Sequence, residues 1–147
     1  MSVHAPEDCT FCAIVAGTSP AVRIFEDDTV LAFLDIFPAT DGHLLVIPKE
    51  HSTDLLDIPP GHLSAVTLTA QRIARHVVDD LGADGVNLLN CCGADAWQTQ
   101  FHFHLHVIPR YRDDDRDTLR PPWRPGVPGD RETLRRVGGV LAAALAD

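Results

Sequence analysis

The chain has 147 residues, 45% of them hydrophobic and 22% charged, with a formal net charge of −9. This length predicts one domain with a single core, and the acidic balance argues against a nucleic-acid-binding surface. The N-terminus lacks the apolar segment of a signal peptide and no run reaches membrane-spanning length, so we expect a cytoplasmic protein that does not associate with membranes.

The first third of the chain predicts a short helix followed by three strands. Residues 1–8 are expected to form a mobile end, and a turn and helix follow over residues 9–16, closed by Gly17. Alternating and β-branched residues, bounded by turn residues and prolines, then predict strands over 21–26, 29–35 and 43–48.

A long amphipathic helix is predicted over residues 62–81. Its apolar side chains recur at steps of three and four residues, at Leu63, Val66, Ala70, Ile73, Val77 and Leu81. Glycine follows at position 82, and we expect His62 and His76 on the solvent-facing side. A fourth strand is predicted over 85–90, followed by a loop over 92–97.

The stretch 98–110 alternates without a break, which predicts a strand. One set of alternate positions is apolar (Phe101, Phe103, Leu105 and Val107). The other set carries the histidines His102, His104 and His106. We expect one face of this strand on the core and three imidazoles in a row on the other. Pro109 should end the strand, because proline cannot donate to the ladder.

Composition changes after Tyr111. Residues 113–117 are expected to be a solvated charge run, and the proline-rich stretch 121–128 an irregular segment. Asp130 is a candidate cap for a final helix reaching about residue 146, with four apolar side chains directed inward: Leu134, Val137, Leu141 and Leu145. The whole pattern predicts an α+β fold, an antiparallel sheet with segregated helices.

The three histidines allow several interpretations from their chemistry alone. They could be satisfied surface residues, metal ligands, or a nucleophile with neighbours that orient it for attack at phosphorus. The pair Cys9-Thr-Phe-Cys12 is equally open: half a zinc site, a redox pair, or two small buried hydrophobes.

The run Phe101-His-Phe-His-Leu-His-Val-Ile108, with Gln98 and Thr99 upstream, resembles the signature of the histidine triad (HIT) family. The resemblance extends over residues 9–111, leaving 112–147 as a C-terminal extension with the terminal helix. It implies a HIT-like fold, commonly a homodimer with a continuous sheet. It also implies a hydrolase or transferase that acts on the α-phosphate of a nucleotide through a nucleotidyl-histidine.

The resemblance implies roles for individual residues around the phosphate. His104 matches the nucleophile, and His106 matches a histidine that contacts the phosphate. Gln98 and Thr99 match side chains that contact phosphate oxygens or the bridging atom, where donors stabilise developing charge. His43 matches a residue that orients the triad from behind.

The resemblance also implies a nucleoside pocket. Asp35 matches the acid that accepts hydrogen bonds from the ribose hydroxyls, and Phe33 and Ile36 match walls of the base pocket. The family commonly has an amide side chain seven residues before the glutamine, where this chain has Cys91, with Asn90 one position off. Either residue is a candidate nucleotide contact. Trp97 stands where a glycine is often found.

Many bacterial members of the family bind zinc through residues that correspond here to Cys9, Cys12, His51 and His102. Two thiolates and two imidazoles form a closed, structural type of zinc site. The resemblance is strongest to the purine nucleoside phosphoramidase branch. The alternatives are a dinucleoside polyphosphate hydrolase, a nucleotide-binding or interaction module with vestigial activity, and a thiol redox protein.

Overall fold

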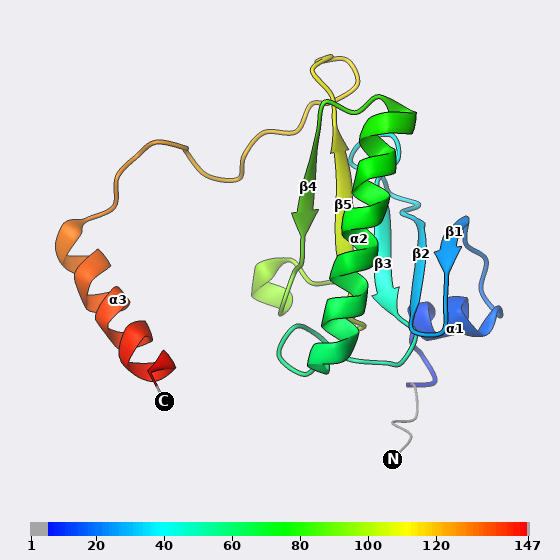
Figure 1. Ribbon diagram of the computed structural model, residues 1–147, viewed down its shortest axis with the longest axis horizontal. Coiled ribbons are helices and arrows are strands. Elements are labelled where there is room, and N and C mark those ends of the chain that lie inside the picture. The colour runs from blue at the N-terminus through cyan, green and yellow to red at the C-terminus, as the bar shows by residue number, and fades with distance from the viewer. Residues whose placement is uncertain (1–5, 147) are drawn as a thin grey trace.

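The computed structural model describes residues 6–146, so most of the predicted mobile end lies outside the described residues. Its centre is a five-stranded antiparallel sheet in the order β1-β2-β3-β5-β4. The strands are β1 (Arg23–Glu26), β2 (Val30–Leu34), β3 (Leu44–Pro48), β4 (Gly85–Leu89) and β5 (Leu105–Arg110). The helices are α1 (Thr10–Ala16), α2 (Pro60–Leu81), the 3-10 turn η1 (Ala94–Ala96) and α3 (Arg131–Leu145). The α+β prediction is confirmed (Figure 1).

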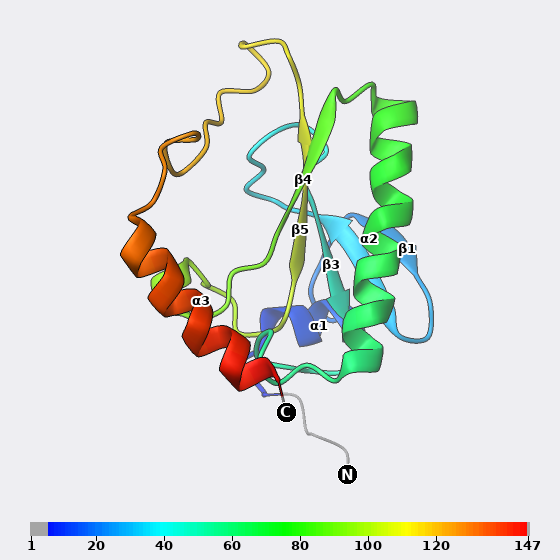
Figure 2. The same cartoon turned by 60° about the vertical axis from the view of Figure 1, so that its left-hand side comes forward.

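Helix α2 covers one face of the sheet, as Figures 1 and 2 show. Val66, Ala70 and Val77 from its apolar stripe are buried against residues of β2, β3 and β5. Proline at the start and Gly82 in the left-handed conformation at the end set its limits. His76 is exposed as expected, whereas the side chain of His62 is half-buried at the start of the helix. No helix in the described part of the chain combines the length and apolarity needed to cross a membrane.

Helix α1 packs on the opposite face of the sheet. Phe11 and Ile14 are buried against Phe33 of β2 and Leu45 and Ile47 of β3. Because both faces of the central strands are covered, β2 and β3 are hydrophobic throughout rather than alternating. The central strands are therefore fixed by packing on both faces, and β5, which continues the histidine segment, pairs with β3 of this rigid centre.

The prediction of one unbroken strand over 98–110 is wrong in its first half. β5 begins at Leu105, so only His106 of the three histidines lies in a strand. The backbone N–H of Phe103 donates to the carbonyl of Ser52 at 2.7 Å, a partner outside the sheet. Phe103, Leu105 and Val107 are buried as expected, but His102 and His104 in the other set of alternate positions are buried as well, and Phe101 is half exposed.

The predicted charge run contains one buried residue. Asp117 is only 3% exposed, and its carboxylate accepts hydrogen bonds from Arg110 Nε at 2.7 Å and from the N–H of Tyr111 at 2.9 Å. It also accepts from the N–H of Leu119 at 3.0 Å. Asp117 therefore fastens the beginning of the extension to the last strand, which a solvated residue would not do.

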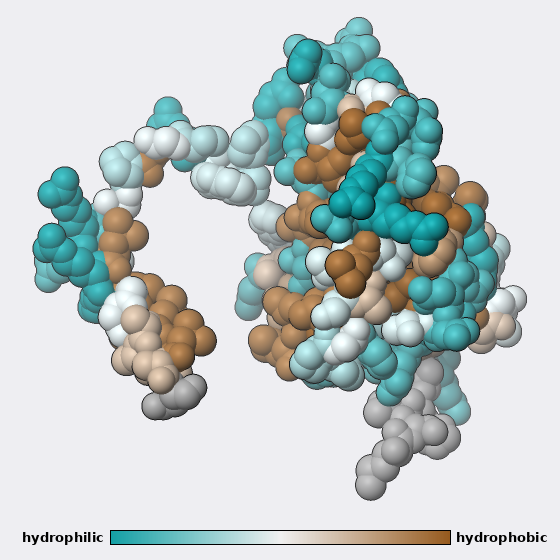
Figure 3. Space-filling model, viewed as in Figure 1, coloured by the Kyte–Doolittle hydropathy of each residue, from teal (hydrophilic) through white to brown (hydrophobic). Residues whose placement is uncertain are grey.

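The final helix forms as predicted, with the Asp130 carboxylate accepting from the N–H of Thr133 at 2.9 Å. Its four apolar residues do not point inward, however, because Leu134, Val137, Leu141 and Leu145 are between 41% and 83% exposed. The segment between β5 and α3 carries the helix away from the sheet (Figures 1 and 2). In Figure 3 the hydrophobic side of α3 faces the body of the protein across open space.

Candidate active site

A pocket of about 460 Å³ opens beside the histidine segment. One wall comes from α1, β2 and the residues after β2, and the other from residues 97–106. Six residues predicted to act on a nucleotide line it: Phe33, Asp35, Ile36, Thr99, His104 and His106. The structure thus brings together most of the catalytic and nucleoside-binding residues inferred from the sequence.

Hydrogen bonding selects one tautomer of His104. Its Nδ1 lies 2.8 Å from the carbonyl oxygen of His102, and because a carbonyl can only accept, Nδ1 carries the proton. The lone pair is then on Nε2, in a ring that lines the pocket. Burial lowers the pKa of His104, against the opposing effect of the bond to His102. A neutral imidazole with a free Nε2 is the form that can act as a nucleophile.

A second hydrogen-bonded chain sets the tautomer of His106. The N–H of Ala39 donates to His43 Nδ1 at 2.9 Å, so the proton of His43 is on Nε2. His43 Nε2 lies 2.9 Å from His106 Nδ1, which must accept, leaving an N–H on His106 Nε2. Burial, followed by the neighbouring His104 and His43, lowers the pKa of His106 to about 4. His106 therefore acts as a neutral donor in the wall of the pocket.

Asp35 lies beside this chain. Its Oδ1 accepts from the N–H of Phe37 at 2.8 Å, and its Oδ2 is 3.6 Å from His43 Nε2. The pKa of His43 is lowered by burial, against the attraction of Asp35. Asp35, His43 and His106 are close enough to hold a metal ion. However, His43 Nε2 carries a proton and cannot coordinate, so this cluster is a hydrogen-bond relay.

The four candidate zinc ligands meet at one point next to α1. Their ligand atoms lie within 4.8 Å of one another. Cys9 Sγ and Cys12 Sγ are 3.5 and 3.4 Å from His102 Nδ1, and His51 Nδ1 is 3.2 Å from the same atom. A tetrahedral zinc ion with ordinary bond lengths requires S–N edges of about 3.6 Å and an N–N edge of about 3.3 Å. The side chains already have that geometry.

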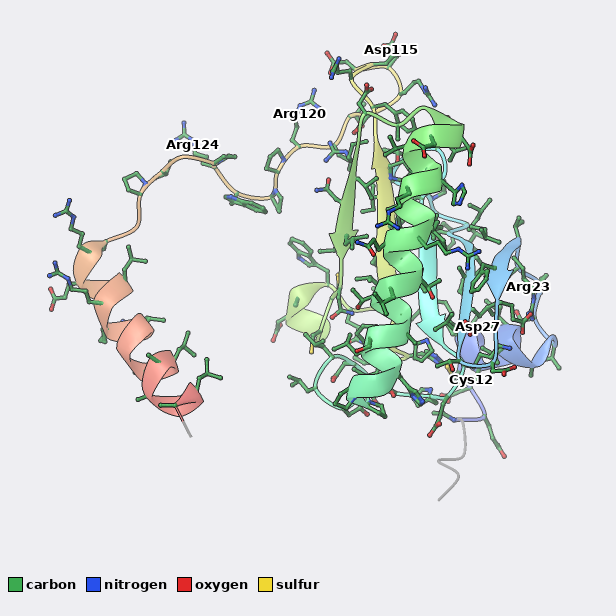
Figure 4. The ribbon with its side chains drawn as sticks, viewed as in Figure 1. Cys12, Arg23, Asp27, Asp115, Arg120 and Arg124 are labelled. Atoms are coloured by element: carbon green, nitrogen blue, oxygen red, sulfur yellow. The ribbon has the colours of Figure 1, made fainter. Side chains whose placement is uncertain are left out.

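The tautomer of His102 also suits a metal. Its Nε2 lies 2.8 Å from the carbonyl of Pro48, so Nε2 carries the proton and Nδ1 offers its lone pair to the thiols. Cys12 lies on α1, near the end of β3 where Pro48 stands (Figure 4). The donor set therefore fits zinc, which would join α1 to the residue that precedes the nucleophile by two positions.

The thiol of Cys12 is poorly suited to redox chemistry. Burial, and then Cys9, raise the pKa of Cys12 to about 12 in the absence of a metal. Reactive thiols need the opposite shift, since the thiolate is the nucleophile. Cys9 and Cys12 are both free, and Cys9 Sγ also accepts from the N–H of Cys12 at 3.4 Å as the cap of α1. The two imidazoles that lie at ligand distance from these thiols, which a redox pair would not need, favour the metal interpretation over the redox alternative.

Gln98 does not lie where the resemblance implied. It is buried, and its Oε1 accepts from the N–H of Gly93 at 2.7 Å. Its Nε2 donates to the carbonyls of Thr53 and Gln100 at 2.8 and 3.1 Å. Because these backbone groups occupy the amide, Gln98 braces the loop before the histidines and has no free donor for a phosphate. Thr99, its neighbour, does line the pocket.

Asn90 and Cys91 are also absent from the pocket wall. Asn90 Nδ2 donates to the carbonyl of His104 at 3.0 Å, and Cys91 is buried. Asn90 therefore supports the backbone of His104, and neither Asn90 nor Cys91 lies where a direct nucleotide contact was expected. Sequence reasoning missed Phe11 and Ile14, whose apolar spacing on α1 was a usable signal, and the backbone groups of Ala39 and Pro48, for which the sequence carried none.

Comparison with known proteins agrees with this geometry. An uncharacterized HIT-like protein of Mycobacterium tuberculosis is 44% identical over 138 residues, which cover 94% of this chain and 93% of that protein. The adenylylsulfatase HINT3 of Arabidopsis thaliana is 42% identical over 107 residues, 73% of this chain and 54% of that longer protein.

Solved structures give the same result. A zinc-bound histidine triad family protein of Mycobacterium smegmatis is 45% identical, with a TM-score of 0.72 over 93% of this chain and 97% of that one. A histidine triad nucleotide-binding protein of Candida albicans is 30% identical, with a TM-score of 0.81 over 95% and 96% of the two chains. Residues 16–113 match the HIT domain. The chain belongs to the HIT domain family.

Proposed function

We propose that this protein hydrolyses purine nucleoside 5′-phosphoramidates, or related nucleotide conjugates, and releases the nucleoside monophosphate. The observation that carries the proposal is the His104 tautomer. Its Nδ1–H is bound to the His102 carbonyl, so its Nε2 lone pair is available in a pocket that also offers the N–H of His106. An oriented neutral imidazole beside a donor is suited to attack at phosphorus.

The nucleoside would occupy the wall formed by α1 and β2. Phe33 is apolar and buried, and Ile36, which also lines the pocket, is 76% exposed and available to cover a flat base. Asp35 keeps acceptor capacity beyond its bond to Phe37, which suits the ribose hydroxyls. This arrangement presents the 5′-phosphate to His104 and His106.

The reaction would proceed in two displacements. His104 Nε2 attacks the α-phosphorus, the bond from phosphorus to the leaving nitrogen breaks, and the amine departs with a proton taken from water. Water then attacks the nucleotidyl-histidine, the phosphorus–Nε2 bond breaks, and the nucleoside monophosphate leaves. His106 Nε2–H, and Thr99 in place of Gln98, are the side-chain donors we assign to the phosphate oxygens.

We also propose one structural zinc ion per chain, held by Cys9, Cys12, His51 and His102. The geometry of the four ligand atoms supports it, as does the zinc-bound relative. When bound, the ion would act as a cross-link between α1 and the histidine segment. Free cysteines in such a set are typical of a reducing compartment, which supports a cytoplasmic location.

The third part of the proposal is a homodimer with a sheet continued across β4. β4 is an edge strand, and an uncovered edge offers unpaired backbone donors and acceptors. Leu88 and Leu89 are 47% and 37% exposed there. The hydrophobic side of α3 faces the body across open space, where a second copy would cover both surfaces (Figure 3).

The test is AMP release from adenosine 5′-phosphoramidate, with a diadenosine polyphosphate assayed in parallel. We expect turnover of the phosphoramidate by the wild-type protein and by His76→Ala, which changes an exposed histidine of α2. His104→Ala should lose at least about a thousandfold in kcat. Faster release from the diadenosine compound would favour the polyphosphate hydrolase instead. AMP binding without turnover of either substrate would establish a binding module.

A further inference from the structure

Trp97 has a backbone conformation that its side chain disfavours. Among the described residues it is the one non-glycine residue with a positive φ, at 72°. In that region the Cβ atom lies too close to the following carbonyl oxygen, so glycine, which has no Cβ, adopts it at the lowest cost. The turn itself is held by backbone bonds, from Trp97 N–H to Ala94 O at 3.0 Å and from Gln98 N–H to Gly93 O at 3.1 Å. A glycine could make these bonds without strain.

The indole is exposed and lies at the pocket. Trp97 is 64% exposed, so it gains little from the core, yet it lines the pocket on the same wall as Thr99 and His104. Strain without burial indicates that the side chain is retained for something it contacts outside the fold.

The direction of the proposed reaction identifies that contact. In-line displacement puts the leaving group on the side of the phosphorus opposite to the attacking His104 Nε2. His104 is only 5% exposed, whereas Trp97, which lines the same pocket, is 64% exposed. A leaving group that points away from the buried His104 therefore extends toward solvent, where the exposed indole at the pocket is available to contact it.

We propose that Trp97 determines leaving-group specificity, by stacking its indole on a flat apolar group attached through the phosphoramidate nitrogen. This inference rests on the proposed hydrolase function. Aromatic faces prefer offset stacking or edge contacts with other rings and bury much apolar area in doing so. A small or strongly polar leaving group would gain little from this surface, and an aromatic one would gain most.

The experiment compares three substrates: adenosine 5′-phosphoramidate and its N-benzyl and N-cyclohexylmethyl derivatives. We expect Trp97→Gly to lower the ratio of kcat/KM for the N-benzyl substrate over the unsubstituted one by about tenfold. The N-cyclohexylmethyl ratio should fall less, because that ring is apolar without a flat π-face. Trp97→Phe should retain most of the preference. The leaving amines differ in basicity, which affects kcat/KM. Because each substrate is compared between wild type and variant, this effect is the same in both and does not alter the comparison.

Trp123→Phe is the matched control, since that tryptophan is 69% exposed and does not line the pocket. Glycine suits the φ of 72°, so Trp97→Gly should melt no lower than the wild type. An equal loss of kcat/KM on all three substrates, or ratios that do not change, would overturn the proposal.

A binding measurement separates this inference from the proposed catalysis. In the His104→Ala background, titration calorimetry with the intact N-benzyl substrate and with AMP measures contact without turnover. Adding Trp97→Gly should weaken the N-benzyl compound about tenfold more than AMP. This result would support the contact even if no substrate were hydrolysed, and equal weakening of the two ligands would sink it.

Discussion

Each histidine of the site receives its tautomer from a different backbone group. The Pro48 carbonyl acts on His102, the His102 carbonyl on His104, and the Ala39 N–H on His43, which in turn acts on His106. Because the backbone cannot change its donors and acceptors, the three rings of one short motif are held in states that suit the three roles we propose for them: metal ligand, nucleophile and hydrogen-bond donor.

His43→Ala tests the relay. Without its ring, His106 Nδ1 loses the donor that fixes it, and the N–H on Nε2 is no longer enforced. We expect kcat for AMP release to fall about 10- to 100-fold, in the range typical of groups that orient a first-contact residue, while KM changes less. Steady-state kinetics on adenosine 5′-phosphoramidate measure both. A raised KM with unchanged kcat would mean that His43 serves binding instead.

The sequence predicted several of the residues that gather at the pocket but not the hydrogen bonds that they make. His104, His106 and Asp35 lie in the pocket wall as the motif implied. Gln98 and Asn90 bind backbone carbonyls instead of facing the pocket. An amide side chain satisfies a phosphate and a peptide carbonyl equally well, and only the folded loop decides which lies within reach.

Among the elements, the sequence pattern located strands β1 to β4 and helix α2 to within two residues at each end. It failed over residues 98–104, where alternation is present but the backbone finds partners outside the sheet, such as the bond from Phe103 N–H to Ser52 O. Alternation indicates which side chains are apolar, and here it did not predict burial, since His102 and His104 are buried while Phe101 is half exposed. It does not report whether a neighbouring strand is long enough to pair.

The zinc proposal makes a prediction about α1. Cys12→Ser should abolish the binding of one zinc per chain and lower the melting temperature by about 10 °C, because α1 loses its cross-link to the histidine segment. Metal content by plasma mass spectrometry and calorimetric melting measure the two effects. Cys92→Ser, which changes a half-buried cysteine outside the ligand set, should alter neither. A metal-free wild-type protein would contradict the proposal.

The ion pair between Arg110 and the buried Asp117 predicts that the stability of the fold depends on pH. The hydrogen bond from Arg110 holds the pKa of Asp117 at about 2, below the ordinary value of 3.8. A lowered pKa in the folded state stabilises it above pH 4, and this contribution disappears as the pH falls toward 2.

Asp117→Asn should therefore lower the free energy of unfolding by about 1–2 kcal/mol at pH 6 and by much less near pH 2. Urea unfolding at a series of pH values measures the difference. Asp114→Asn, whose carboxylate is 88% exposed, is the control and should leave the curve unchanged. A constant difference between Asp117→Asn and wild type across this range would refute the assigned pKa.

For the whole molecule, the sequence predicted that α3 forms but not where it lies. The amphipathic pattern correctly predicted a helix with one apolar face, and that face is exposed in the single chain. A hydrophobic stripe requires a cover but does not specify which chain supplies it. Residues 121–128, which include four prolines, separate α3 from the sheet (Figure 1). The residue pattern within α3 carries no information about this separation.

Two glutamate substitutions on α3 test the dimer. Leu141→Glu places a charge on the apolar stripe, whereas Ala143→Glu places the same charge about 200° away around the helix. We expect Leu141→Glu to raise the dimer dissociation constant at least about tenfold and Ala143→Glu to leave it near the wild-type value. Sedimentation velocity measures both against a chain mass of 16.0 kDa. Equal effects, or a monomeric wild type, would contradict the proposed interface.

Residue 102 contributes its side chain to the metal set and its carbonyl to His104. Every amino acid has that carbonyl, whereas few have the imidazole. The two contributions can therefore diverge independently over evolutionary time. A lineage that replaced both cysteines and the imidazole at position 102 would lose the cross-link but still present the nucleophile in its working tautomer. We expect HIT domains without the cysteine pair to keep the equivalents of His104 and His106, with tighter packing around α1 in place of the metal.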